Sequence, residues 1–259
     1  MKRLVSVLLF GAAFCFYAPA SDAQTERFLI PTVAHEPIPG AFGSLWVTEI
    51  AGRNVGLAEV PLRFPCEPDY PLCTYMSIPP GGSFSHPTPW SRNSPHGTVL
   101  ETFSGVADHL LITARVRDLS RGHLTWGTEI PIVRESRVTG TPITLLDVPN
   151  AERFRLTLRM YDFEHNVGNF FIVRAFALTG DVPLAEITVP MSLLTDSDGM
   201  SQGLYFAVIS ELPLPADAPE RLRLEIQTAI PTKYWAFASL TNNETQHVTV
   251  IRPTRPGSD

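Results

Sequence analysis

Residues 233–253, KYWAFASLTNNETQHVTVIRP, are the stretch that decides the fold. In residues 234–241, large apolar side chains occur at both odd-numbered and even-numbered positions. In a strand, Trp235 and Phe237 would point to one face and Tyr234 to the other. A strand of this kind is expected to be covered on both faces or to lie near a sheet junction. Residues 242–245 supply turn chemistry, because Asn tolerates left-handed backbone and bonds its own chain. The stretch therefore predicts a β-hairpin that closes the last unit of the chain.

The chain before this hairpin shows one plan twice. An Asn-Val-Gly turn follows the first long strand of each half, at residues 54–56 and 166–168. Each half later has an acidic connection that leads into a strong strand, in GVADHLLITARV (105–116) and DAPERLRLEIQT (217–228). We infer a tandem duplication with a boundary near residues 134–142.

Short apolar runs at regular spacing, separated by many prolines, predict strands rather than helices. The expected fold is all-β, with two tandem immunoglobulin-like (Greek-key) β-sandwiches at residues 24–137 and 138–259. Each sandwich is expected to have its own core, so residues 24–137 should fold alone. In the alternating stretch 153–161, Leu158 should point inward and Tyr161 outward. A single large barrel or jelly roll is the alternative fold.

Residues 1–23 are typical of a secretion signal. Lys2 and Arg3 give a positive start, residues 4–17 form an apolar stretch too short to cross a bilayer, and small residues before position 24 offer a cleavage site. An uncleaved membrane anchor is the alternative. The sequence thus predicts a secreted or periplasmic protein whose mature chain does not insert into a membrane.

Charge and cysteine content narrow the partners and the chemistry. Without the signal, the exported chain keeps 18 basic and 25 acidic residues, a net charge of −7. That charge argues against nucleic acid as a partner. Cys66 and Cys73 are expected to form a disulfide, because exported proteins meet an oxidising compartment. The loop that this disulfide closes is short, so it should stabilise the fold by only about 2–3 kcal/mol.

Three stretches, GTEIPIVRE (127–135), RFRLTLRMYD (153–162) and YWAFASLTNNETQHVTVIRP (234–253), together carry a family resemblance. The pattern resembles exported bacterial proteins of uncharacterised function with tandem immunoglobulin-like β-sandwich domains. The resemblance covers most of the exported chain. It implies architecture and compartment, and it brings no catalytic or binding residues.

No motif for enzymatic chemistry stands out. The seven histidines form no H-x-x-x-H or H-E-x-x-H pair, and no G-x-S-x-G occurs. His86 and His96 share one loop, but they supply only two of the three or more ligands that a metal needs. Residues 196–199 (DSDG) resemble the start of a calcium loop that lacks its closing Glu, and turn chemistry also explains them. We expect no catalytic residue, metal or cofactor. A hydrolase is the third alternative, because paired carboxylates cannot be recognised from sequence.

Aromatic and arginine side chains are the candidate ligand-binding residues. Trp90, Trp126 and Trp235 could stack on a sugar ring, and the outward-facing Arg155 and Arg159 could bind an acidic group. The structural alternatives are core packing for the tryptophans, and cross-strand ion pairs or aromatic contacts for the arginines. We expect a non-catalytic interaction or adhesion protein that presents loops and sheet faces to a protein or glycan. A carbohydrate-binding module that uses exposed tryptophans is the alternative.

Overall fold

The computed structural model of the chain confirms an all-β fold. The described residues are 24–63, 75–85, 94–124, 126–164, 166–195 and 201–254. Helix within them is confined to α1 (Ser104–Ala107) and the 3-10 turns η1 (Ala41–Gly43), η2 (Leu119–Leu124) and η3 (Glu135–Arg137). The predicted signal peptide and the predicted Cys66–Cys73 disulfide lie outside the described residues. No helix in the described part of the chain is long and apolar enough to cross a membrane.

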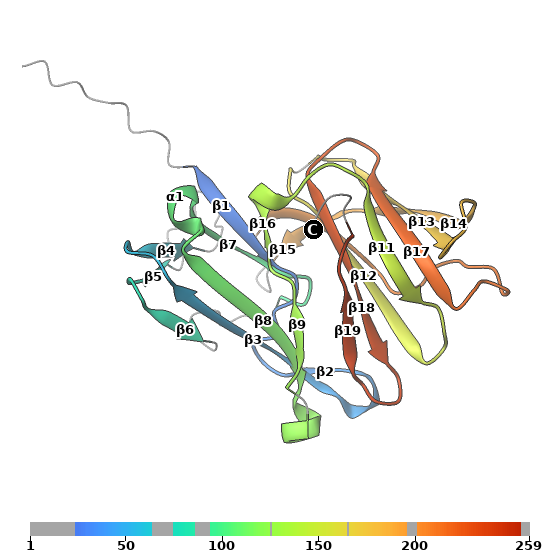
Figure 1. Cartoon of the computed structure of the whole chain (residues 1–259), viewed down its shortest axis with the longest axis horizontal. Helices are drawn as coiled ribbons and strands as arrows, with labels where there is room; N and C mark the ends of the chain where they lie inside the picture. Colours follow the sequence, from blue (N-terminus) through green and yellow to red (C-terminus); the bar gives the residue numbers. More distant parts are fainter. Residues whose placement is uncertain are drawn as a thin grey trace, which may run out of the picture.

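The first half of the chain forms two antiparallel sheets (Figure 1). One has the strand order β10-β1-β7-β4-β5 and contains β1 (Thr25–Ile30), β4 (Val60–Arg63), β5 (Tyr75–Ile78), β7 (Thr98–Phe103) and β10 (Val133–Arg134). The other has the order β2-β3-β8-β9, with β6 also paired to β3, and contains β2 (Ile38–Pro39), β3 (Leu45–Asn54), β6 (Ser83–Ser85), β8 (Leu110–Asp118) and β9 (Thr128–Ile130). Apolar side chains from both sheets share one buried cluster, so the two sheets form a β-sandwich.

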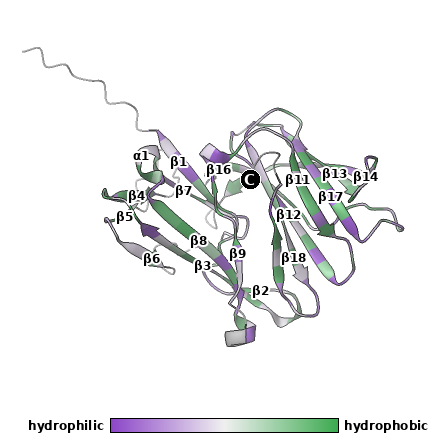
Figure 2. Ribbon diagram, viewed as in Figure 1, coloured by the Kyte–Doolittle hydropathy of each residue, from purple (hydrophilic) through white to green (hydrophobic). Residues whose placement is uncertain are grey.

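The second half forms a further pair of antiparallel sheets. One has the order β11-β17-β13-β14 and contains β11 (Ile143–Pro149), β13 (Phe170–Ala177), β14 (Pro183–Pro190) and β17 (Arg221–Thr228). The other, which we call the hairpin sheet, has the order β15-β16-β12-β18-β19 and contains β12 (Phe154–Asp162), β15 (Ser192–Thr195), β16 (Ser201–Ile209), β18 (Tyr234–Asn242) and β19 (Val248–Ile251). Figure 2 shows hydrophilic and hydrophobic residues alternating along β17, as expected for a strand with one face in a core.

The two halves repeat one strand order. The run β1-β7-β4-β5 corresponds to β11-β17-β13-β14, and β6-β3-β8-β9 corresponds to β16-β12-β18-β19. Strands β3 and β8 pair over nine residues, as do their counterparts β12 and β18. Every ladder between described strands joins two strands before residue 135 or two strands after residue 142. The same sandwich arrangement therefore occurs twice in the chain.

Matching turns at both ends of the nine-residue ladders strengthen this correspondence. Asn54 ends β3 and Asp162 ends β12, and each side chain accepts a hydrogen bond of 2.9 Å from the N–H group two residues on. At the opposite end, Asp118 and Asn242 accept equivalent bonds, at 3.0 and 2.9 Å. The correspondence of the two Asn-Val-Gly turns is therefore wrong, because the counterpart of residues 54–56 is 162–164.

The hairpin predicted from residues 233–253 is confirmed, and β18 is covered on both faces. This strand lies between β12 and β19 in the hairpin sheet. Tyr234 and Ala236 belong to the core of the second sandwich, whereas Trp235 and Phe237 belong to the buried cluster that begins in the first half. Because successive side chains of a strand point to opposite faces, β18 places one parity of residues into each of two cores.

The core of the first half continues across the outer face of the hairpin sheet. Tyr161, Trp235 and Phe237 pack in one cluster with first-half residues such as Leu29. Tyr161 points outward from the second sandwich and Leu158 inward, as predicted, but Tyr161 is fully buried there, with its hydroxyl 2.9 Å from the carbonyl oxygens of Pro31 and His96. Burial raises the pKa of this hydroxyl to about 12. Each half has a buried cluster, but the cluster of the first half is not self-contained, because it includes side chains from the second half.

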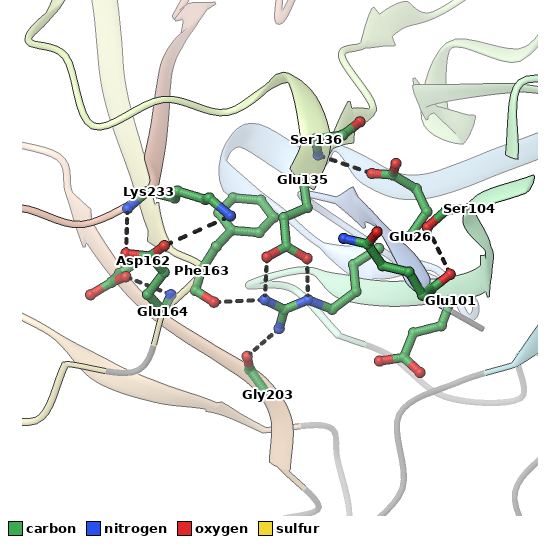
Figure 3. A network of polar contacts seen from close by, with 12 residues as sticks. Glu26, Glu101, Ser104, Glu135, Ser136, Asp162, Phe163, Glu164, Gly203 and Lys233 are labelled. Atoms are coloured by element: carbon green, nitrogen blue, oxygen red, sulfur yellow. Dashed lines mark hydrogen bonds and ion pairs between the residues drawn. The ribbon is translucent and has the colours of Figure 1, made fainter. Parts of the chain in front are cut away.

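Arg27 on β1 binds three other parts of the chain at this junction, through Glu135, Phe163 and Gly203, which are labelled in Figure 3. Its guanidinium donates two hydrogen bonds to Glu135, at 2.7 and 2.9 Å. It also donates to the carbonyl oxygens of Phe163, at 2.6 Å, and Gly203, at 2.8 Å. The side chains of Arg27 and Glu135 are only 17% and 21% exposed, so these charge-assisted bonds are largely shielded from solvent. These contacts of Arg27, which we call the Arg27 joint, link β1 both to the segment that connects the two halves and to the hairpin sheet.

Candidate binding site

One end of the molecule places exposed aromatic side chains of the first half beside a turn of the second half. Figure 1 shows β2, η2 and the turn between β18 and β19 at the lower edge. Phe42 in η1 is 75% exposed and Trp126 after η2 is 77% exposed, more than any other Phe or Trp of the described chain. We call this region the aromatic end and define it by Phe42, Trp46, Trp126, Arg155 and His247.

Arg115 and Gly127 fix the position of Trp126. The guanidinium carbon of Arg115 on β8 lies 5.0 Å from the centre of the indole ring, within the range of a cation–π contact. Gly127 follows with a φ of +84°, and a Cβ there would lie 2.6 Å from the carbonyl oxygen of Val116. The turn that displays Trp126 therefore requires glycine at position 127.

A groove of about 250 Å³ runs between the first half and the β18–β19 turn. Its two aromatic walls are the exposed Trp126 and the half-buried Trp46, which lies on β3. The remaining lining residues are Val116, Asp118, Arg121, Gly127, Thr128, Gln246, His247 and Val248. The groove thus combines two indole rings with one carboxylate, one guanidinium and one imidazole.

Asp118 is the buried polar anchor of this groove, with only 3% of its side chain exposed. Burial raises the pKa of its carboxyl, but hydrogen bonds from the Leu45 N–H, from Ser120 and from Arg121 outweigh burial and hold the pKa below its usual value. Arg121 contributes through Nε, which lies 3.2 Å from Asp118 Oδ2. The carboxylate therefore stays ionised and fixes the position of the Arg121 side chain.

Arg155 connects Phe42, on the other side of the aromatic end, to the turn between β18 and β19. Its guanidinium donates to Gln246 Oε1 at 2.9 Å and lies 5.4 Å from the centre of the Phe42 ring. Gln246 in turn donates to the carbonyl oxygen of Asn243 at 2.6 Å, and Asn242 Oδ1 accepts from two N–H groups of the turn. These bonds hold the turn in one shape between Phe42 and Trp126.

Two further hollows lie on the molecule. One, of about 740 Å³, is lined by Ala41, Phe154, Arg155 and Glu211 among others. The second, of about 590 Å³, lies at the junction of the halves beside Trp235 and Arg134. The guanidinium of Arg134 in this second hollow is bonded to Glu26 and Asp108.

The structure brings two predicted ligand-binding residues, Trp126 and Arg155, to the aromatic end. Trp235 is only 4% exposed and stacks on Phe237 at 5.0 Å, so its prediction as a ligand platform is wrong: the ring is used as core. Arg159 donates to the carbonyl oxygen of Pro95 at 2.8 Å and so helps to join the halves. Trp90 lies outside the described residues.

Sequence reasoning missed Phe42, Trp46, Arg121 and His247 as parts of the site. The signal for Phe42 was its place in Gly40-Ala41-Phe42-Gly43, because a large apolar side chain in a glycine-rich loop has little core to enter. Trp46 and Arg121 gave no such signal. Trp46 reaches the groove through the β3–β8 ladder, in which it is paired with Asp118, and Arg121 reaches it from η2, which follows β8.

Most of the other arginines have structural partners, as the alternative interpretation predicted. Arg117 pairs with Glu49 at 2.8 Å and Arg223 with Glu225 at 3.3 Å. Arg153 lies over Phe154 and Arg134 over Phe28, and Arg223 also lies over Phe176. Exposed pairs of this kind contribute about 0.2–1 kcal/mol each.

The described chain offers no obvious metal centre. No group of three or more His, Cys, Asp or Glu side chains lies together within the described ranges. His96 stacks on Phe206 at 4.6 Å, and burial together with the charge of Arg159 lowers its pKa. His86 and the DSDG stretch at residues 196–199 lie outside the described residues.

Comparison with protein-family models finds no family that matches this chain, and comparison with curated proteins finds no similar sequence. The functional inference therefore rests on the geometry of the aromatic end.

Proposed function

We propose that the chain is a secreted or periplasmic, non-catalytic interaction protein that presents its aromatic end to a protein or glycan. The observation that carries this proposal is the exposure of Phe42 and Trp126 on either side of one fixed turn. Large aromatic side chains are enriched in recognition surfaces and contribute much of their binding energy. Their exposure at one end of an otherwise well-packed molecule favours a binding role.

The architecture supports this proposal. We interpret the repeated sandwich as two tandem immunoglobulin-like domains behind a signal peptide, an arrangement that places loops from both domains at one end. The shared core and the Arg27 joint fix these loops relative to one another. A binding surface that is fixed in advance loses less conformational entropy when a partner binds.

A carbohydrate-binding module is the second candidate function. The specific observation that favours it is the open face of Trp126 beside a groove that also contains Trp46, Asp118 and Arg121. An indole face suits the apolar face of a sugar ring, while a carboxylate and a guanidinium suit its hydroxyl groups.

Equilibrium binding of residues 24–259 to an array of glycans and purified extracellular proteins tests the proposal. The variants are Trp126→Ala and Phe42→Ala, with Phe103→Ala as the matched control, because Phe103 is 44% exposed on β7, outside the aromatic end. We expect saturable binding of at least one ligand that both aromatic-end variants weaken and the control retains. Binding that neither variant changes, no saturable binding on the array, or catalytic turnover of a bound ligand would each contradict the proposal.

A further inference from the structure

We propose that the groove between Trp46 and Trp126 binds one pyranose ring of an acidic saccharide. This inference rests on the proposed function, because it names a ligand class for the aromatic end. The groove, at about 250 Å³, is smaller than the ~300–1,000 Å³ pockets that enclose drug-sized molecules. Its size therefore suits a single sugar ring, with the rest of a glycan chain lying outside.

Trp126 supplies the platform for the ring. Arg115 lies against one face of the indole, and the 77% exposure of the side chain leaves the other face open. The C–H groups on one face of a pyranose form a flat apolar surface that matches an indole in size and loses contact with water on stacking. Because Arg115 and the Gly127 turn fix the indole beforehand, little further ordering is required when the sugar binds.

Arg121 and His247 supply hydrogen-bond donors at the edge of the groove. The structure gives Arg121 one side-chain partner among the described residues, Asp118, and this contact uses its Nε. The exposed imidazole of His247 has no hydrogen bond to any described residue. The terminal nitrogens of Arg121 and the imidazole are therefore available to hydroxyl and carboxylate oxygens of a ligand.

The local charge favours a saccharide that carries a carboxylate. Asp118 and Arg121 neutralise each other, and Glu129, which lies opposite Arg115 in the β8–β9 ladder, pairs with Arg252 at 3.1 Å. Arg115 itself lies against Trp126 without an ion pair to the described residues. The charged groups that line the groove therefore balance, and Arg115 adds a positive charge behind the indole, next to the groove, on a chain whose net charge is −6. Such local complementarity selects an acidic ligand over a neutral one.

Isothermal titration of residues 24–259 with tetragalacturonate and with neutral maltotetraose tests the inference. We expect tetragalacturonate to bind saturably and more tightly than maltotetraose, and more weakly at high salt. Trp126→Ala should weaken binding by about tenfold, Trp126→Phe should restore part of it, and Arg121→Gln should weaken it by about fivefold. Arg174→Gln is the matched control, because Arg174 forms an exposed pair with Glu186 in the other sheet of the second sandwich. This control should bind as the unchanged protein does.

Equal affinity for the two saccharides, or tetragalacturonate binding that Trp126→Ala and Arg121→Gln leave unchanged, would overturn the inference. If Trp126→Ala fails to fold, the affinities of Arg121→Gln and Trp126→Phe for tetragalacturonate decide the test. The absence of saccharide binding together with binding of a protein through Phe42 would overturn this inference and leave the proposed function standing. The absence of both would overturn both.

Discussion

Replacing Arg27 by Met tests how strongly the junction holds the two halves together. Met keeps an apolar stem but removes the guanidinium, so Glu135 loses both of its bonds and the carbonyl groups of Phe163 and Gly203 lose their donor. Removing one partner of a buried ion pair costs about 3–5 kcal/mol. The remaining exposure of Arg27 and Glu135 allows some hydration, so we expect a loss near the lower limit, about 3 kcal/mol. In a chain of this size, that loss lowers the Tm by about 6–12 °C.

Urea unfolding and calorimetry of Arg27→Met measure this loss directly. Arg174→Met is the control, because both members of its ion pair are partly exposed and such pairs contribute at most about 1 kcal/mol. A double-mutant cycle with Glu135→Gln separates the coupling of the pair from other effects of each substitution. The reasoning is refuted if Arg27→Met loses no more stability than the control.

Two further predictions concern the groove. The carboxyl of Asp118 has a folded pKa below its ordinary value of 3.8, so its stabilising contribution is complete above about pH 4 and is lost as the pH falls through the folded pKa. The difference in Tm between the unchanged protein and Asp118→Asn should therefore shrink below pH 4, and a difference that stays constant from pH 7 to pH 3 would argue against it. Gly127→Ala should cost about 1–3 kcal/mol, because alanine would have a positive φ and a Cβ 2.6 Å from the Val116 carbonyl oxygen. Gly105→Ala in α1 is its control and should be neutral or stabilising, because no atom lies within 4 Å of the added Cβ; equal effects of the two substitutions would contradict the argument.

Much of the architecture could be predicted from residue patterns. The alternation of apolar residues and the position of turn residues predicted an all-β chain, and the apolar residues at both parities of 234–238 predicted a strand covered on both faces. These features depend on local rules of strands and turns, which a sequence displays directly. The strand order repeats, but the local marks that suggested a repeat do not correspond: residues 105–116 lead into β8, whereas residues 217–228 lead into β17, the counterpart of β7.

The junction between the halves could not be predicted in the same way. Tyr161 alternates with apolar neighbours and looks like a solvent-facing residue, yet it is buried because another sheet covers that face. The roles of Arg27 and Arg159 depend on carbonyl groups more than 60 residues away in sequence. Likewise, Trp46 and His247 meet in one groove only because β3 and the β18–β19 turn lie at the same end of the fold. Burial and contact between distant segments depend on tertiary packing.

Calorimetry of residues 24–259 and of residues 24–137 tests the central claim, that side chains of the second half complete the core of the first sandwich, so that the two sandwiches form one cooperative body. The shorter chain lacks Tyr161, Phe163, Trp235 and Phe237, which pack in the first-half cluster, and each buried side chain of this size contributes about 1.5–3 kcal/mol. Together these losses are comparable to the ~5–15 kcal/mol stability of a whole domain. We predict a single transition for residues 24–259 and no cooperative transition for residues 24–137. Two separate transitions in the longer chain, one of them retained at the same temperature by residues 24–137, would contradict the account.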